Sequence, residues 1–550
     1  MSFKLPTTVR GNIPALLSPE TKLPITNLDR EFAVIHRNVN DNKDKLNDIP
    51  DQDFIQLSSS LDLYGGLRRE FLNKGFPFST NASLKMYELI KEMNLIDCNE
   101  PIRAFCDAEL PGSFIVAINH YVKTVCQNSS TASNNSDFDW IGSSYYPEAA
   151  AKEGDETILG DKYGFYANNR NNWLMGPKPN AMPADSVVGD ITGDLTNGEV
   201  IKTLTNAVHK RFETTSGATI ATSDAGIDVS ADYSNQEKST ALLNYGQIVA
   251  AILSLAPGGH MVTKQYTFIR PFNRSVIALV AFLFEESYVV KPVTSRPGNS
   301  EIYLVGKYFR GIDEVLANGL LNRFVVYAQG LSPVDGAPLF DPNTYVDIDN
   351  ELLKAGKKIH DEQQVEFLKE MDDIYNNKEY PRAALPQISQ KLQKEWLEKY
   401  PVLPITKEDL LNWKNKPAAT PAPAATSTPT TTVYDTIANV IPDNVGETFN
   451  NAVDTITDVF TGGAMPPSIS EAMPSSISEA DPTSISEEAT PPSISEDNET
   501  IITEQTMNTS DISNPEGINF LINKEEDNNE NEAENNEEGE GEGEKKTITI

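Results

Sequence analysis

Residues 102–114 read IRAFCDAELPGSF, and the fold class follows from the pattern that starts there. The apolar run is typical of a buried strand, and Pro111 and Gly112 form a turn soon after it. A Pro-Gly turn after a first strand lets backbone approach a nucleotide-like ligand, because glycine tolerates positive φ and carries no side chain. An ordinary tight turn explains these residues about as well.

Short apolar runs alternate with helical stretches from about residue 102 onward. Strands that alternate with helices are typical of an open, mostly parallel sheet with helices on both faces. Such sheets bind ligands at the carboxyl ends of their strands. The sequence therefore predicts an α/β fold. The apolar runs lie at 102–106, 115–125, 219–223, 241–256, 260–263, 276–284, 288–290 and 302–305.

Two further strand ends carry charge. Asp224 follows the β-like run at 219–223, and Lys264 ends a short strand that follows the turn PGG at 257–259. Taken alone, each charge is more often a surface residue than a catalyst. Together they point to one crevice, because charges at the ends of parallel strands converge there.

Charge and composition limit what the chain can do. It has 550 residues, a net charge of −35 and only 39% apolar residues, which indicates that part of it forms no compact core. Residues 461–550 hold 3 basic and 22 acidic residues, and the remainder is acidic as well. General attraction to nucleic acid is not predicted, so a nucleic-acid role requires a local basic cleft.

Composition also divides the chain. Residues 1–60 form a polar N-terminal extension, 61–311 the α/β domain with an insertion at about 127–185, and 312–415 an appended helical region. Residues 416–432 form a Pro/Ala/Thr linker, 433–460 have the spacing of a short amphipathic helix, and 461–550 form a disordered acidic tail with SISE repeats. The tail is a candidate contact for a protein partner.

The cysteines and the apolar runs indicate the compartment. Cys98, Cys106 and Cys126 form no CxxC pair, which predicts free thiols in a reducing compartment. The start, MSFKLPTTVRGN, lacks the apolar region of a signal peptide, and the longest apolar runs are far short of the ~20 residues that span a bilayer. We expect a soluble cytoplasmic protein without a membrane partner.

Four charged residues resemble the Lys-Asp-Lys-Glu tetrad of the FtsJ/RrmJ-like ribose 2′-O-methyltransferases. They are, in chain order, Lys85, Asp224, Lys264 and Glu301. The chain is most similar to the cap-specific mRNA 2′-O-methyltransferases of eukaryotes and large DNA viruses. The resemblance spans about residues 64–310 and is carried by NASLKMYEL, AELPGSF, GDITGD, TSDAGID, PGGHMVTK and KPVTSRPGNSEIYLV.

The resemblance implies a Rossmann-like fold that uses S-adenosylmethionine. Lys264 would be the general base on the ribose 2′-hydroxyl, with the other three tetrad residues holding it, and Ser295 and Arg296 would line the same site. A viral relative would work in a virion or a viral factory. The residues implied at the cofactor are Pro111, Gly112, Ser113, Phe114, Asp190 and Ile191.

The first motif departs from the family pattern, which places an acid five residues before the proline and a glycine three before it. Those positions hold Cys106 and Ala108, while Asp107 lies one place over and Glu109 is an added charge. Because this motif forms the cofactor loop in the family, the departure is expected to change the affinity for the cofactor.

The tetrad also makes sense as chemistry. A lysine at its usual pKa of ~10.4 is protonated at neutral pH and cannot accept a proton. We expect partial burial and the nearby Lys85 to lower the pKa of Lys264 toward ~7–8, while the two carboxylates hold the geometry. Because the methyl group is already activated on a sulfonium, alignment and deprotonation suffice and no metal is required. The five histidines show no ligand spacing.

An RNA substrate needs local cations for its phosphates. The candidates are Arg68, Arg69, Arg270 and Arg296, followed by Lys74, Arg274, Lys291 and Arg310. Four aromatic residues of the expected insertion either stack on a cap base or nucleotide, or pack the insertion on the sheet. They are Tyr163, Phe165, Tyr166 and Trp173.

The sequence thus predicts an S-adenosylmethionine-dependent RNA ribose 2′-O-methyltransferase that acts on the first transcribed nucleotide of capped mRNA. Two alternatives stay open. One is a non-catalytic FtsJ-like structural or RNA-binding protein, such as a virion component, and the other is a methyltransferase of ribosomal or transfer RNA. The complete tetrad favours an enzyme, whereas the altered first motif favours the non-catalytic protein.

Overall fold

The structure is a computed structural model of the chain. It describes residues 1–7, 13–128, 137–147, 159–176, 192–226, 235–377 and 385–413. The linker at 416–432, the amphipathic segment at 433–460 and the acidic tail at 461–550 lie outside these residues, so they stay predictions.

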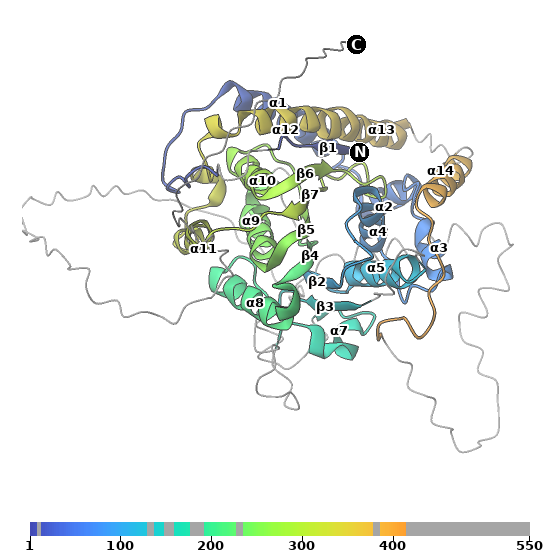
Figure 1. Cartoon of the computed structure of the whole chain (residues 1–550). Coiled ribbons are helices and arrows are strands. Elements are labelled where there is room, and N and C mark those ends of the chain that lie inside the picture. Colours follow the sequence, from blue (N-terminus) through green and yellow to red (C-terminus); the bar gives the residue numbers. More distant parts are fainter. Residues whose placement is uncertain are drawn as a thin grey trace, which may run out of the picture. The chain divides into compact units, whose positions relative to one another are not determined.

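Seven strands form one mixed sheet (Figure 1). The four strands from β3 to β5 in the spatial order are parallel, whereas β7 is antiparallel to β5 and β6, and β1 is antiparallel to β6. The predicted α/β fold is confirmed. In spatial order the strands are β1 (Ser2–Lys4), β6 (Phe284–Val290), β7 (Ile302–Phe309), β5 (Leu255–Gln265), β4 (Ala218–Ser223), β2 (Ile102–Asp107) and β3 (Phe138–Gly142).

The central strands are buried on both faces, which explains their continuous apolar runs. In β2, three successive residues, Ala104, Phe105 and Cys106, have no exposed surface. Helices that cross between parallel strands cover both faces of such a sheet. The run therefore reads as apolar throughout, without the alternation of a half-exposed strand.

Helices cover the two faces as expected. Figure 1 shows α8 (Gly198–Arg211), α9 (Gln236–Ser254) and α10 (Pro271–Leu283) on one side of the sheet, and α4 (Asn81–Met93) and α5 (Ser113–Tyr121) on the other. Each side has its own apolar cluster, so the core consists of two layers separated by the sheet. Each fully buried aliphatic side chain in these layers contributes about 1.5–3 kcal/mol.

The ends of the described chain pack onto this core. β1 extends the sheet by pairing with β6, so the expected extension at 1–60 contributes a strand. The helix α1 (Asn27–Asp44) packs against α12 (Val346–Gly356) and α13 (Val365–Asn377). Arg274 of α10 is buried between Asp29 of α1 and Asp349 of α12, where it forms ion pairs with both.

The remaining elements complete the fold, and among them α11 packs against α8 and α9. The helices are α2 (Asp51–Ser60), α3 (Leu67–Asn73), α7 (Phe165–Asn168), α11 (Glu314–Ala328) and α14 (Leu385–Lys399). Wider π-helical turns are η1 (Val122–Cys126) and η8 (Lys357–Gln364), and 3₁₀ turns are η3 (Arg170–Asn172), η4 (Glu213–Thr215), η6 (Pro333–Asp335) and η7 (Pro342–Thr344).

The stretch expected as an insertion at about 127–185 contains a strand of the sheet. β3 pairs in parallel with β2, and Trp173 forms a bridge to Gly142 at its end. Phe165, Tyr166 and Trp173 are buried against one another and on this edge. Of the two roles considered, packing is the one observed for these three residues, because buried rings present no face to a nucleotide. Tyr163 is half-buried and stacks on Phe78, and its stacking on a nucleotide stays a prediction.

Cys98 and Cys126 form a disulfide, which corrects the expectation of free thiols. Cys98 follows α4, and Cys126 ends η1, which continues α5. Since α4 packs against α5, the two cysteines meet without any CxxC spacing that could have signalled them. Cys106 is a free, buried thiol. None of the helices in the described residues is long and apolar enough to cross a lipid bilayer.

Candidate active site

Three parallel strands end, and the antiparallel strand β7 begins, at the same edge of the sheet. In the register of the sheet Asp107 of β2 lies beside Ser223 of β4, Ser223 beside Thr263 of β5, and Lys264 beside Tyr303 of β7. Because β7 is antiparallel to β5, its beginning lies where the parallel strands finish. Asp224 and Glu301, which flank β4 and β7, therefore come together with Lys264 at this edge.

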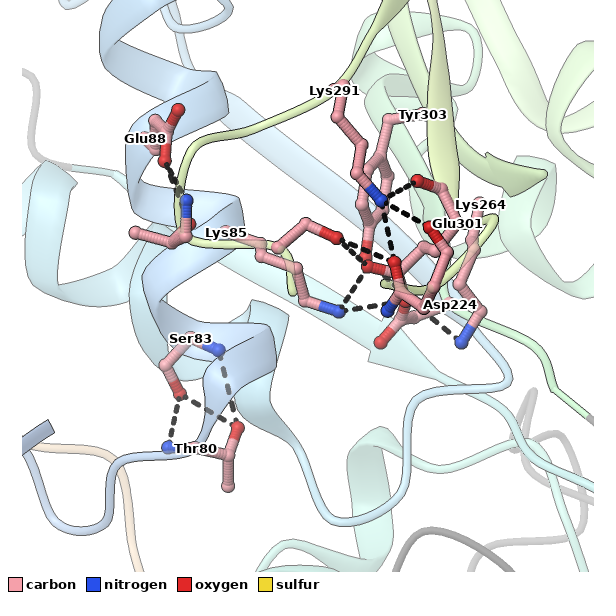
Figure 2. A network of polar contacts seen from close by, with 12 residues as sticks. Thr80, Ser83, Lys85, Glu88, Asp224, Lys264, Lys291, Glu301 and Tyr303 are labelled. Atoms are coloured by element: carbon pink, nitrogen blue, oxygen red, sulfur yellow. Dashed lines mark hydrogen bonds and ion pairs between the residues drawn. The ribbon is translucent and has the colours of Figure 1, made fainter. Parts of the chain in front are cut away.

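Lys85 reaches the same edge from α4. This helix begins with a capping box in which the Thr80 hydroxyl accepts from the Ser83 amide, so its first turn is fixed. The Lys85 Nζ donates to both carboxylate oxygens of Glu301, at 2.9 and 3.0 Å. Figure 2 shows Lys85 extended from the helix toward the strand ends. The structure thus brings all four tetrad positions together.

Lys264 and Asp224 form the second ion pair of the site. The Lys264 Nζ lies 3.3 Å from Asp224 Oδ1, and the Tyr303 hydroxyl donates to the same oxygen at 2.8 Å. Tyr303 is fully buried, and its ring lies 5.5 Å from the Lys85 ammonium. Tyr303 is not among the residues predicted from the sequence, although it follows Glu301 by two and a strand places residues two apart on one face.

The pKa of Lys264 is raised, contrary to the expected lowering. Burial disfavours its ammonium, but the carboxylate of Asp224, together with Tyr266 and Glu301, outweighs that effect. The expectation assumed that Lys85 acts on Lys264 as a like charge. In the structure Lys85 pairs with Glu301 instead, so each lysine has its own carboxylate.

Three lysines act on the carboxylate of Glu301. Lys85, Lys264 and Lys291 outweigh its burial and lower the pKa of its carboxyl group. The Ser295 hydroxyl donates to Glu301 Oε1 at 2.8 Å. Lys291, considered above as a phosphate contact, is buried and donates to the Glu301 carbonyl oxygen at 2.7 Å and to Asn299. It supports the loop rather than facing solvent.

The loop before Glu301 is fixed by a carboxylate from α4. Glu88 accepts from the backbone amides of Val293 and Thr294, at 2.8 and 3.2 Å, and from the Thr294 hydroxyl at 2.8 Å. Burial raises the pKa of Glu88. The same helix therefore supplies Lys85 to the carboxylate of Glu301 and Glu88 to the loop that carries it (Figure 2).

The Pro-Gly turn has the geometry that only glycine allows. Gly112 has φ of +103°, and a Cβ there would lie 2.2 Å from the ring of Phe165. Glu109 is buried below the turn and accepts from the amides of Phe114 and Ile115, at 2.7 and 3.1 Å, at the start of α5. The extra charge noted in the sequence is therefore a helix cap.

A cavity of about 480 Å³, here called the site cavity, joins the turn to the tetrad. Its lining includes all four tetrad residues, Glu109, Ser295 and Arg296, and three of the six residues expected at the cofactor: Pro111, Ser113 and Phe114. Gly112 packs against Phe165 beside it. Asp190 and Ile191 lie outside the described residues.

The expected phosphate contacts separate into distinct groups. Arg296 lines the site cavity, and Arg68 bonds Asn81, which also lines it. Arg69 is exposed on α3, and Arg270, before α10, lines neither this cavity nor the second one considered below. Arg274 as a phosphate contact is wrong, because it is buried between two carboxylates in the core.

Known proteins resemble this chain in the region of the site. Residues 166–309 match the model of a family described as FtsJ-like methyltransferase. The African swine fever virus protein named probable methyltransferase EP424R is 35% identical over 319 residues, which cover 57% of this chain and 68% of the relative. The mouse cap-specific mRNA (nucleoside-2′-O-)-methyltransferase 2 is 29% identical over 221 residues, covering 40% of this chain and 25% of that protein.

One solved structure, a putative ribosomal RNA methyltransferase from Plasmodium falciparum, covers 42% of this chain and 99% of its own at 17% identity and a TM-score of 0.28. The viral relative, in contrast, is matched over more than two thirds of its length at 35% identity. The family model covers both Asp224 and Lys264 with the strands that carry them. The chain therefore belongs to the FtsJ-like methyltransferase family.

Proposed function

We propose that the protein is an S-adenosylmethionine-dependent RNA ribose 2′-O-methyltransferase that acts on the first transcribed nucleotide of capped mRNA. The observation that carries the proposal is the Lys264–Asp224 pair, which lies in one cavity with the Pro-Gly turn. A base and a cofactor turn that share a cavity of this size fit the transfer of a small group between two bound molecules.

The residues present fit S-adenosylmethionine. The cofactor carries positive charge on its sulfonium and its amino group. Glu109 lines the site cavity and has no ion-pair partner among the described residues, and its burial raises its pKa well above the usual range. A buried carboxyl group in that state gains a partner when a cation lies in the cavity. Pro111, Ser113 and Phe114 would hold the cofactor beside it.

The chain itself aligns the hydroxyl and removes its proton. S-adenosylmethionine supplies a methyl group that is already activated. Lys264 Nζ accepts the proton of the 2′-hydroxyl, and Asp224, itself fixed by Tyr303, holds Lys264 in place. Because the pKa of Lys264 is raised in the free protein, it must first lose a proton, and positive charge brought close to it favours that loss.

The RNA target rests on the relatives and on local charge. The name of one relative states that it methylates the 2′-oxygen of nucleosides in mRNA in a cap-specific way. Arg296 supplies a cation at the cavity itself, which an acidic protein needs for phosphate contact. The relative's name supports capped mRNA over ribosomal or transfer RNA, whereas the cation supports RNA of any class.

The test is transfer of a labelled methyl group from S-adenosylmethionine to short RNAs. One RNA bears a 7-methylguanosine cap without ribose methylation, and another has the same sequence without the cap. We expect methylation of the capped RNA at its first ribose, loss of transfer in Lys264→Ala, and full transfer in Lys238→Ala, whose lysine forms an exposed ion pair with Asp335 and does not line the site cavity.

Several outcomes would change the proposal. Methylation at the second nucleotide would correct the position, and equal methylation of the uncapped RNA would remove the cap from it. Absence of transfer together with absence of cofactor binding in calorimetry would contradict the proposal and leave the non-catalytic protein.

A further inference from the structure

A second and larger cavity, of about 820 Å³, lies beside the site cavity. We call it the side cavity. Arg296, Asn299 and Glu301 line both cavities, so a molecule that extends from the tetrad can continue into the side cavity. Its volume is in the range that holds small organic ligands. The proposed methyl-transfer step does not use this cavity.

The walls of the side cavity come mainly from outside the part that matches the family model. One wall is the end of α1 with α2, and another is α13, whereas the model covers residues 166–309. Residues 1–60 and 312–415 therefore meet at this cavity. The loop at 296–300 is tied to α1 and to η8, which leads into α13, because the Ser300 hydroxyl accepts from Lys43 Nζ and Gln364 Nε2, each at 3.0 Å.

Two cations of the side cavity lack a carboxylate partner among the described residues. Lys43 has a hydroxyl, that of Ser300, as its hydrogen-bond acceptor. Arg296 forms no ion pair in the described part of the chain, and its Nε is buried without a hydrogen bond. Burial also lowers the pKa of Lys43 to about 8, which shows an ammonium that would be stabilised by an anion.

The carboxylates of the same lining are accounted for. Asp62 is paired with Arg68 at 3.4 Å, and Glu301 is paired with Lys85. Asp44 is exposed. The two cations thus remain for a ligand, and phosphate is the anion that an RNA brings in continuity with its ribose.

An aromatic ring supplies the other half of a nucleotide site. Phe54 of α2 lines the side cavity and is 40% exposed, although most large apolar side chains of the fold are buried. Leu46 and Met371 provide apolar surface near it. An exposed ring beside unpaired cations is the combination that binds single-stranded nucleic acid, with bases stacked on rings and phosphates on cations.

We propose that the side cavity binds one phosphate-linked nucleotide of the RNA, next to the nucleotide whose ribose is modified. Lys43 and Arg296 bind phosphate, and Phe54 stacks on the base. The choice of RNA rests on the proposed function, whereas the nucleotide chemistry rests on the cavity. Residues 1–60 and 312–415 therefore bind the RNA that the part matching the family model modifies.

The test is fluorescence anisotropy of a labelled, capped six-nucleotide RNA with the full chain. We expect Phe54→Ala to raise Kd at least about fivefold, the lower limit for loss of one stacked base, and Phe54→Tyr to restore binding. Lys43→Gln should reduce the slope of log K against log salt by about 0.7, the contribution of one phosphate on a single strand. Lys45→Gln, an exposed neighbour that does not line the cavity, should leave the slope unchanged.

Wild-type Kd and slope in both Phe54→Ala and Lys43→Gln would overturn the inference, provided that thermal unfolding shows folded variants. Guanosine 5′-monophosphate distinguishes the source of the nucleotide. If it binds in a Phe54-dependent way and RNA does not displace it, the cavity serves a free nucleotide and the RNA assignment is wrong.

Binding and methyl transfer separate this inference from the proposed function. Phe54-dependent RNA binding without any transfer overturns the proposed function alone. Transfer whose KM for RNA is the same in Phe54→Ala and wild type overturns the side-cavity inference alone.

Discussion

Replacement of Glu301 by glutamine removes the negative charge on which three lysines of the site converge. Lys85 donates to both of its oxygens, and Lys264 and Lys291 lower its pKa through their charge. In Glu301→Gln the buried Lys85 keeps a hydrogen-bond acceptor but loses its ion pair. Breaking a buried pair by removal of one partner costs about 3–5 kcal/mol, because the other charge stays in the interior without compensation.

The sign of the pH dependence follows from the lysines. The charge of Glu301 raises the pKa of Lys264 and of Lys291 in the wild type, so without it the folded variant binds fewer protons than the folded wild type as these lysines titrate. The destabilisation relative to wild type should therefore shrink between pH 7 and pH 10. Urea unfolding at a series of pH values, followed by tryptophan fluorescence, measures it.

Glu286 provides the matched control in the same sheet. It pairs with Lys4 at 2.8 Å and Lys307 at 3.6 Å, but it is 30% exposed. Glu286→Gln should cost less than about 1 kcal/mol, as exposed pairs do. If the two variants lose equal stability, or if the loss in Glu301→Gln does not change with pH, the charge balance described for the site is wrong.

Three further predictions concern the core, a buried carboxyl group and the cysteines. Arg274→Met should cost about 3–5 kcal/mol in urea unfolding, against less than about 1 kcal/mol for Lys357→Met at an exposed pair, and equal losses would contradict the buried clamp. Burial raises the pKa of Asp107 to about 8, so its folding-linked proton uptake stabilises the protein below pH 4 and this stabilisation is lost as pH rises to 8. Asp107→Asn should gain stability relative to wild type by up to about 5 kcal/mol over that range, and a difference independent of pH would refute the assignment. Denatured, unreduced protein should react with one equivalent of maleimide, whereas three equivalents would exclude the Cys98–Cys126 disulfide.

The strand ends of the site were predictable because topology alone brings them together. Asp224 and Lys264 follow short apolar runs, and parallel strands converge at their carboxyl ends whatever the helices between them do. Lys85 and Glu301 could be added only through a resemblance, since a helix carries Lys85, Glu301 precedes an antiparallel strand, and no periodicity relates the two.

The pairing within the site was not predictable from residue types. Two lysines and two carboxylates can form two lysine–carboxylate ion pairs, or the two lysines can lie side by side. The first arrangement raises the pKa of Lys264 and the second lowers it. Lys85 faces Glu301 because the α4 register, fixed by the Thr80 cap, points it there. The order of residues in the sequence does not indicate how α4 is rotated about its axis.

No strand was predicted within residues 1–60 or 127–185, for a related reason. β1 has three residues and β3 five, and both lie at edges of the sheet, where few apolar residues are needed. The residue pattern of a short edge strand cannot be distinguished from that of a polar segment. The Cys98–Cys126 pair likewise depends on how α4 packs against α5.

The dependence of the methyl-transfer rate on pH tests the central claim, that Lys264 is the base, most directly. Because the pKa of Lys264 is raised, only a small fraction of it can accept a proton at neutral pH. The kcat/KM for S-adenosylmethionine, which reports the ionisation of the free protein, should therefore rise about tenfold per pH unit from pH 6.5 to 9, and transfer should vanish in Lys264→Ala. A kcat/KM that is flat over this range, or transfer that survives in Lys264→Ala, would contradict the account.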